Sequence, residues 1–213
     1  MEKKTNLLLL GGGGHCLSVI ESIESTGLFN IIGISDTPDR VGKSILDYKI
    51  LVSDDQIPNL RIENLKCLIT IGQIRTAEPR ILAYNFLKNN MHVLATIIDR
   101  HSMVSERSSI NEGTVILRNS FINSGVVIGH NCIINTGAII EHSSIIGNHV
   151  HISTGAIVNG DCNIGDRCFV GSGAIISNGI SVCSDTIIGA GCIVLVDIEV
   201  PGTYLGNPAR RIK

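Results

Sequence analysis

The sequence has little aromatic character: no tryptophan, three tyrosines and four phenylalanines among 213 residues. Aliphatic side chains must therefore build most of the core, and 23 glycines interrupt them along the chain. Glycine is unfavourable inside helices, so this composition argues against a helical bundle.

Charge and long hydrophobic runs are also scarce. Lys and Arg total 17 against 19 Asp and Glu, with no basic run, which disfavours binding of nucleic acid or an anionic membrane through the net field. The mean hydropathy is +0.31, but the longest apolar run, Cys192–Val196, is far short of the roughly 20 residues that span a membrane. The N-terminus lacks the apolar core of a signal peptide, so we expect a cytoplasmic protein without a membrane partner.

A hexapeptide repeat organises the second half of the chain. Every sixth residue from Val104 to Val194 is Ile or Val, and Ile98 extends the series by one step. Four residues after each aliphatic position lies a mostly small residue, and glycine often follows the aliphatic directly. This period predicts a parallel β-helix of about five triangular coils, left-handed as in known hexapeptide solenoids, with the aliphatic side chains inside.

The repeat also accounts for most of the seven cysteines. Cys132, Cys162, Cys168 and Cys192 occupy the small inward position, where a free thiol acts as a small apolar filler. The odd count, the lack of a C-x-x-C motif and the lack of an export signal predict reduced thiols rather than a disulfide framework.

The first half contains no hexapeptides and reads as a small α/β domain. Strands are predicted at 6–10, 31–35, 48–52, 67–71 and 93–97, with helices at 15–26 and 78–89. A strand, a glycine loop, a helix and a second strand ending at an acidic residue follow the order of a mononucleotide-binding βαβ unit. Four glycines, Gly11–Gly14, allow a ligand to approach the backbone, and the following helix N-terminus favours phosphate.

Two details limit this interpretation. The loop GGGGHC is not a complete G-x-G-x-x-G motif, because Cys16 stands at the sixth position, which makes a dinucleotide dehydrogenase less favoured. Asp36 is suited to accept hydrogen bonds from ribose or sugar hydroxyls, but SDTPD is also typical of a solvated turn.

Five further segments follow one another along the chain: LLLLGGGGHCLSVIE, GISD, ITIGQIR, NTGAIIEHSSIIGNHVHISTGAIVNGDCNIG and GTYLGNPARRIK. In this order they resemble the sialic acid O-acetyltransferase family of bacterial sugar acetyltransferases, which includes UDP-4-amino-sugar N-acetyltransferases of the bacillosamine and perosamine type. The resemblance implies a Rossmann-like domain at 1–98 that holds a nucleotide sugar. It also implies an all-β left-handed β-helix at 99–213, including a C-terminal tail, that holds acetyl-CoA, and a homotrimer with active sites between adjacent prisms.

The resemblance places the general base at His142, within the motif Ile140-Glu141-His142. An imidazole titrates near neutral pH and so suits proton transfer from an attacking amine. Much of the family has an acidic residue directly after this histidine, whereas this chain has Ser143. Three alternatives remain: Glu141 turns back to His142, a neighbouring subunit supplies a carboxylate, or His142 is less basic.

The other site residues follow from the same resemblance. The catalytic set also includes Asn135 and Gly160, whose N–H is suited to stabilise an oxyanion, together with Glu141. Acetyl-CoA, a co-substrate, would contact His151, Ser172, Gly173, Ala190 and Gly191. The nucleotide sugar would contact Gly13, Gly14, His15, Ser35, Asp36 and Arg75.

The sequence thus predicts an acetyl-CoA-dependent acetyltransferase acting on a UDP-linked 4-amino-4,6-dideoxy sugar and requiring no metal. The main alternative is O-acetylation of sialic acid or a related nonulosonate. A non-catalytic sugar-binding scaffold and a zinc hydratase are the alternatives of other classes. The histidine spacing in the solenoid and the α/β half argue against the zinc hydratase.

Overall fold

The computed structural model describes residues 4–213, and its first strand, β1 (Thr5–Leu10), is the apolar run that the sequence predicts. β1 is central in a mixed sheet of order β3-β4-β2-β1-β5-β6, in which only β3 runs antiparallel to its neighbour. The leucines of β1 alternate between two cores: Leu7 and Leu9 pack with the first helix, and Leu8 and Leu10 pack with the second. Both faces of the sheet are therefore buried, as is typical of α/β domains.

The elements of this domain follow the predicted order. The strands are β2 (Phe29–Asp36), β3 (Ser44–Ile45), β4 (Tyr48–Ser53), β5 (Leu65–Ile69) and β6 (Val93–Leu94). The helices are α1 (Gly14–Thr26), α2 (Glu78–Asn89) and the 3₁₀ turns η1 (Pro38–Arg40) and η2 (Asp54–Asn59). Among residues 4–213, no helix is long and apolar enough to cross a membrane.

The predicted strands at 67–71 and 93–97 were wrong in their boundaries. β5 ends at Ile69, and the next residues leave the sheet edge as a loop. β6 ends at Leu94, and Ile97 begins β7 (Ile97–Ile98), which pairs with β10 of the second half instead of with the first sheet. The proposed domain division at 1–98 and 99–213 therefore falls just after β7, which precedes the boundary in the chain but pairs with the β-helix.

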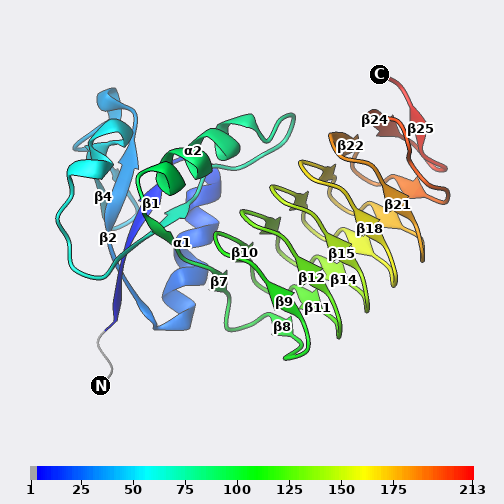
Figure 1. The fold of residues 1–213 in the computed structure, drawn as a ribbon, viewed down its shortest axis with the longest axis horizontal. Coiled ribbons are helices and arrows are strands. Elements are labelled where there is room, and N and C mark those ends of the chain that lie inside the picture. Colours follow the sequence, from blue (N-terminus) through cyan, green and yellow to red (C-terminus); the bar gives the residue numbers. More distant parts are fainter. Residues whose placement is uncertain (1–3) are drawn as a thin grey trace.

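The second half is a parallel β-helix with three faces (Figure 1). Face 1 contains β7, β10 (Val115–Ile116), β13 (Ile133–Ile134), β16 (His151–Ile152), β19 (Phe169–Val170), β22 (Thr186–Ile188), β24 (Gly202–Leu205) and β25 (Arg210–Arg211). Face 2 contains β8 (Met103–Val104), β11 (Phe121–Ile122), β14 (Ile139–Ile140), β17 (Ile157–Val158), β20 (Ile175–Ile176) and β23 (Ile193–Val194). Face 3 contains β9 (Ser109–Ile110), β12 (Val127–Ile128), β15 (Ile145–Ile146), β18 (Asn163–Ile164) and β21 (Ser181–Val182).

The predicted inward ladder is confirmed. Strand partners are 18 residues apart, as in Ile116 with Ile134, so each coil stacks its aliphatic residues on those of the next. From Ile116 to Val194 these side chains are at most 2% exposed, while Val104 and Ile110 are partly buried at the open end of the stack. The four cysteines at small inward positions are also buried, as the repeat predicts.

The glycines that follow the aliphatic residues have a steric reason. A Cβ at Gly147 would lie 2.5 Å from Asp166 Oδ1 and 2.8 Å from its backbone nitrogen. A Cβ at Gly171 would lie 2.5 Å from the backbone nitrogen of Ala190. At these two corners, after face 3 and after face 1, the coils stack too closely for a side chain, and the recurring glycine results from that contact.

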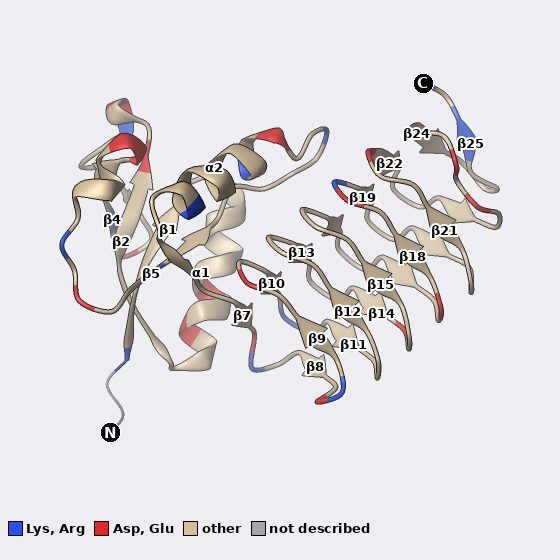
Figure 2. Cartoon of the chain, in the orientation of Figure 1, with Lys and Arg blue, Asp and Glu red and all other residues tan. Residues whose placement is uncertain are grey.

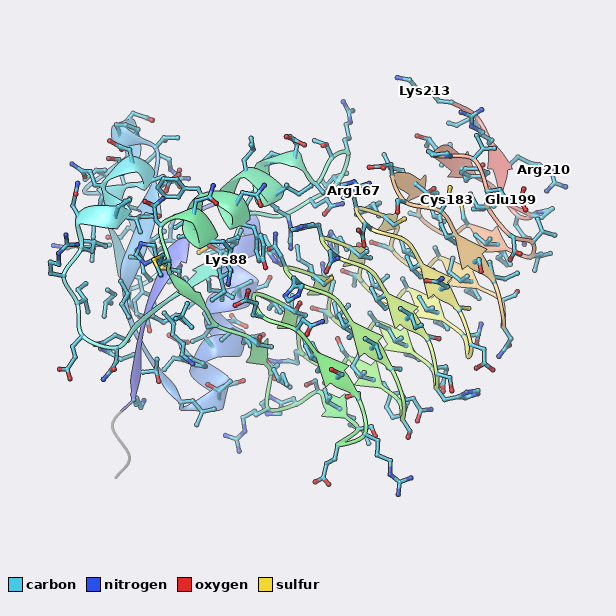
Figure 3. All side chains as sticks on the ribbon, in the orientation of Figure 1. Lys88, Arg167, Cys183, Glu199, Arg210 and Lys213 are labelled. Carbon is cyan, nitrogen blue, oxygen red and sulfur yellow. The ribbon has the colours of Figure 1, made fainter. Side chains whose placement is uncertain are left out.

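Charged residues lie at the corners of the β-helix, and the strands from β8 to β23 carry none (Figure 2). Arg167 marks one corner (Figure 3), where its guanidinium donates to both carboxylate oxygens of Asp185 at 2.7 Å. At the junction of the two halves, Lys88 of α2 pairs with Glu112 at 2.7 Å (Figure 3). Helix α2 is therefore attached to the β-helix as well as to the sheet.

Candidate active site

A cleft of about 1080 Å³ lies where the glycine loop of the α/β domain meets face 1 of the β-helix. Its walls come from both halves of the chain, because α2 and the loop before it pack against the first coils. The cleft is lined by Gly11, Gly12, Gly13, Gly14, His15, Asp36, Thr37, Arg40, Asp54, Ile71, Gly72, Gln73, Ile74, Arg75, Thr76, Asn135, His151, Ser153, Phe169, Gly171, Ser172 and Ala190.

The glycine loop forms an open floor at one end of this cleft. Gly11 has φ +96°, and a Cβ there would lie 2.6 Å from Ile71, so glycine is required by both the backbone and the packing. A Cβ at Gly13 or Gly14 would meet no atom within 4 Å, so space for a ligand lies directly above the start of α1. The first N–H groups of a helix and its positive dipole end favour an anion at this place.

Asp36, at the end of β2, is already engaged by three donors. Its Oδ2 accepts from Gly12 N at 2.8 Å and from Arg40 Nη1 at 2.5 Å, and its Oδ1 accepts from Thr37 N at 2.7 Å. Arg40 also donates from Nη2 to the Gly12 carbonyl at 2.9 Å. The carboxylate therefore joins the glycine loop to η1 and fixes a guanidinium beside the loop.

Two histidines, the partly buried His15 and the buried His151, stand where the loop approaches face 1. Their ring centroids are 6.4 Å apart. His151 Nδ1 is 2.8 Å from the Gln73 carbonyl, which only accepts, so Nδ1 carries the proton and Nε2 accepts from Asn135 Nδ2 at 3.1 Å. Burial lowers the pKa of His151 to about 4, although the Gln73 carbonyl opposes this. Burial, together with the charge of Arg80 and with His151, lowers the pKa of His15 to about 3.

Arg80 of α2 is a fully buried cation behind the part of the cleft that His15 and His151 line. Its Nη2 donates to the Asn131 backbone carbonyl and, at 3.0 Å, to Asn131 Oδ1, and its Nη1 lies 3.5 Å from the Ile71 carbonyl. Within residues 4–213 it has no carboxylate partner, and burial lowers its pKa to about 10. The contact fixes α2 and the loop at Ile71 to one corner of the β-helix, which sets the position of Gln73 and hence of His151.

Acid is expected to destabilise the fold between about pH 6.5 and pH 4 through His15 and His151. Both folded pKa values lie below the ordinary value of 6.5, so the unfolded chain takes up protons first as the pH falls. The stability is complete above pH 6.5 and is lost progressively towards the folded pKa values of about 4 and about 3, by several kcal/mol in total. Thermal melts from pH 7.5 to pH 4.5 measure this loss.

Two variants check that this acid effect comes from the buried histidines. His151→Gln removes one titrating group and should flatten the pH dependence of the melting temperature. His101→Gln removes an imidazole whose side chain is 54% exposed and should keep the wild-type slope. A His151→Gln slope equal to that of wild type would contradict the assignment.

The predicted acetyl-CoA positions lie at the other end of the cleft. Ser172 and Ala190 line it at the corner between faces 1 and 2, and Gly173 and Gly191 follow them as exposed turn residues. Ser172 Oγ lies 3.0 Å from Ser153 Oγ of the coil below. These residues form a polar edge that runs along the stacked coils.

His142 lies apart from the cleft, at the corner between faces 2 and 3, and its side chain is exposed. Its ring rests on Gly160 of the next coil, where a Cβ would lie 2.5 Å from Cε1 and 2.6 Å from Nε2. The Gly160 N–H has no acceptor within residues 4–213. The structure thus brings His142 and Gly160 together, but it places both on a different corner from Asn135.

Glu141 does not turn back towards His142. Its carboxylate accepts a hydrogen bond from Asn123 Nδ2, one coil below, and no hydrogen bond joins it to His142 in the described part of the chain. Ser143 follows with φ +61°, so the corner turns sharply after His142. The sequence left three alternatives for the basicity of His142, and the first of them, a Glu141 side chain turned back to His142, does not occur within a single chain.

The remaining predicted residues divide between the cleft and its support. Arg75 lines the cleft and is exposed, whereas Ser35 is fully buried outside the lining, and its carbonyl accepts from Gly11 N. Sequence reasoning missed Arg40, Gln73 and Arg80: Gln73 lies within the quoted segment ITIGQIR but was given no role there, and no motif marks Arg40 or Arg80. No group of three His, Cys, Asp or Glu side chains within 4–213 has an arrangement that could hold a metal ion.

Comparisons with known proteins agree with this architecture. Residues 6–78 match the model of the PglD N-terminal domain, and residues 109–142 and 163–195 match the hexapeptide repeat of succinyl-transferase. A comparison with curated protein sequences gave no match.

Several solved structures match nearly the whole chain, including the following three. The acetyltransferase domain of PglB from Neisseria gonorrhoeae FA1090 in complex with acetyl coenzyme A has 26% identity and a TM-score of 0.91, covering 99% of this chain and 100% of that one. PerB from Caulobacter crescentus in complex with CoA and GDP-perosamine has 29% identity and a TM-score of 0.89, covering 98% and 97%. WeeI from Acinetobacter baumannii AYE shares the fold, with 20% identity, a TM-score of 0.84 and coverage of 98% and 100%. The chain therefore combines a PglD-type N-terminal domain with hexapeptide repeats, in the same overall arrangement as the acetyltransferase domain of PglB and as PerB.

Proposed function

We propose that this chain is an acetyl-CoA-dependent N-acetyltransferase that acts on the amino group of a nucleotide-linked sugar. The observation that carries the proposal is the single cleft joining the glycine loop to face 1 of the β-helix. Matches over almost the whole chain support it, because they include PglB with acetyl-CoA and PerB with CoA and GDP-perosamine. Transfer of an acetyl group from acetyl-CoA to a nucleotide sugar requires that both ligands bind in one cleft.

The two ends of the cleft suit the two ligands. Gly13, Gly14 and the start of α1 favour the diphosphate of a nucleotide sugar, and Arg75 adds a cation at the rim. The polar corner at Ser172 and Ala190 suits the pantetheine arm of acetyl-CoA. His15, Asn135 and His151 lie between these ends, next to the sugar and the thioester.

In the proposed reaction, the nitrogen of the sugar amine attacks the thioester carbonyl of acetyl-CoA. This attack forms the C–N bond and gives a tetrahedral intermediate, whose collapse breaks the C–S bond. His142 accepts the proton released by the nitrogen and returns it to the departing thiolate, which leaves as the CoA thiol. The neighbouring Gly160 N–H, which has no acceptor in the described chain, is a suitable donor to the oxyanion.

His151 is poorly suited to be the base. Its Nδ1 proton is held by the Gln73 carbonyl, and its Nε2 lone pair accepts from Asn135. Burial also lowers its pKa to about 4, so it binds protons weakly at neutral pH. We therefore assign His151 a binding role as a neutral imidazole.

Because His142 lies on another corner of the prism, the proposal requires a second copy of the chain to complete the site. Face 2 provides a surface for that copy. Its outward residues form an unbroken apolar column that consists of Met103, Phe121, Ile139, Ile157, Ile175 and Ile193. Apolar stripes that stay partly exposed in a single chain are typical of interfaces, and a closed ring of three prisms buries them symmetrically. His142 follows directly after face 2, so it would lie at this interface.

The trimer is expected to depend on face 2. Light scattering of the purified protein should give three times the 22.8 kDa chain mass. Ile157→Glu puts a charge in the middle of the apolar column and should yield a folded monomer with little activity. Asn163→Glu, on the exposed side of face 3, is the matched control and should remain trimeric. A fully active wild-type monomer would rule the trimer out.

A panel of acceptor substrates tests the function itself. We expect CoA thiol release from acetyl-CoA with a UDP-linked 4-amino-4,6-dideoxy sugar, and the panel adds the GDP-linked amino sugar and CMP-linked sialic acid. Release only with a hydroxyl acceptor would assign O-acetylation instead. Binding of nucleotide sugars without thiol release would indicate a sugar-binding scaffold.

A further inference from the structure

The fixed guanidinium beside the glycine loop has no role in the function proposed above. Arg40 stands at the end of η1, its side chain is 31% exposed, and it lines the cleft next to Gly12. Two of its five N–H groups are used, one on Asp36 Oδ2 and one on the Gly12 carbonyl. Three N–H donors therefore remain for a ligand.

We infer that Arg40 binds the diphosphate of the nucleotide sugar and that Asp36 is a positioning residue for Arg40. This inference rests on the proposed function, since it assumes that a nucleotide sugar enters this cleft. It reverses the expectation drawn from βαβ folds, in which the acidic residue at the end of the second strand contacts the ribose directly.

The contacts of Asp36 support this assignment. A carboxylate has about four acceptor positions, and Asp36 already accepts from Gly12, Thr37 and Arg40. Two of those donors are backbone N–H groups that belong to the fold and do not leave when a ligand arrives. Little acceptor capacity therefore remains for a ribose hydroxyl.

The position of Arg40 supports a phosphate ligand. Its guanidinium is bonded to the loop whose next two residues, Gly13 and Gly14, have open space above them. Two further polar atoms of the cleft lining, His15 Nε2 and Gln73 Oε1, are buried without a partner, which indicates that the cleft is built to receive a polar ligand. A fork of N–H donors beside a helix N-terminus matches the oxygens of a diphosphate.

Binding measurements on four variants of the full-length protein test the inference. Isothermal titration would compare UDP and GDP with uridine and guanosine, which lack the phosphates. Arg40→Met should weaken binding of the diphosphates by about 10- to 100-fold and leave nucleoside binding unchanged, since a charge-assisted contact is lost. Arg61→Met, an arginine of the same domain outside the cleft lining, is the matched control and should bind like wild type.

Asp36→Asn and the double variant Asp36→Asn/Arg40→Met separate positioning from direct contact. If Asp36 acts through Arg40, Asp36→Asn weakens diphosphate binding in the wild-type background and adds nothing in the Arg40→Met background. A loss of nucleoside binding in Asp36→Asn that persists in the double variant would show that Asp36 contacts the ribose and would overturn the inference. Tighter binding of UDP or GDP by Arg40→Met would also overturn the inference, since the Arg40 side chain would then block the phosphate position instead of binding the phosphates.

The outcome for the wild-type protein separates this inference from the proposed function. If wild type binds UDP or GDP and Arg40→Met binds within twofold of it, only the role of Arg40 fails. If wild type binds no nucleoside diphosphate and releases no thiol with any nucleotide sugar, the proposed function fails and the inference with it. Thermal melts of each variant establish that a loss of binding is not a loss of fold.

Discussion

Replacing His142 with alanine is expected to lower kcat by about 10²- to 10⁴-fold at neutral pH, as the loss of a general base typically does. The fold and acetyl-CoA binding should remain, because His142 is exposed at a corner of the coil and lies outside the inward ladder. Steady-state thiol release measures the loss. His101→Ala removes an exposed imidazole elsewhere and should keep wild-type activity. A His142→Ala enzyme with more than a third of the wild-type kcat would show that His142 is not the base.

The pH dependence of the His142→Ala enzyme distinguishes an amine from a hydroxyl acceptor. At high pH the solvent deprotonates a sugar ammonium group, so the defect should shrink if the acceptor is an amine. A sugar hydroxyl keeps its proton throughout the accessible range, and no recovery is expected. Gly160→Ala is a second probe of the geometry, because its Cβ would displace the His142 ring on which the mechanism depends.

Mixing two inactive variants tests whether the active site is shared between chains. The first variant, Ser172→Trp, should fill the acetyl-CoA end of the cleft from an exposed turn position, while its His142 stays intact. The second variant is His142→Ala, whose cleft stays unblocked. In mixed trimers, some sites would combine an unblocked cleft from one chain with His142 from the other, so part of the activity should return. No recovery after proven subunit exchange would place cleft and base in one chain and contradict the composite site.

Ile164→Asp is expected to destabilise the β-helix by about 3–5 kcal/mol, since it buries an unpaired carboxylate in the inward ladder. Ile164 is 0% exposed and stacks between Ile146 and Val182 in face 3. A loss of this size is a large part of the net stability of an ordinary domain. Urea unfolding at a fixed chain concentration measures it, because subunit association also contributes to stability.

Asn163→Asp is the matched control for this prediction. It introduces the same side chain one position earlier in β18, where the residue points outward and is exposed. Surface substitutions of this kind usually change stability by less than about 0.5 kcal/mol. Equal unfolding midpoints for Ile164→Asp and Asn163→Asp would mean that the inward register is wrong.

The sequence determined the β-helix and the order of the α/β elements because both arise from local patterns. Each coil repeats the same environment every six residues, so the aliphatic, small and glycine positions recur where Ile146, Cys162 and Gly147 stand. The leucine run of β1 and the glycine loop before α1 are likewise short-range signals. The division of roles between an α/β domain and a repeat domain could therefore be predicted.

Only the tertiary structure decided how the site is assembled. Arg80 meets Asn131 across 51 residues and His151 meets Gln73 across 78, and both contacts depend on how α2 and the loop before it dock on the β-helix. No local period encodes such docking. Asn135 and His142 are seven residues apart, yet a coil with a corner every six residues places them on different corners, one at the cleft and one away from it. The family resemblance assigned both residues to one catalytic set, whereas the geometry of the coil separates them within a single chain.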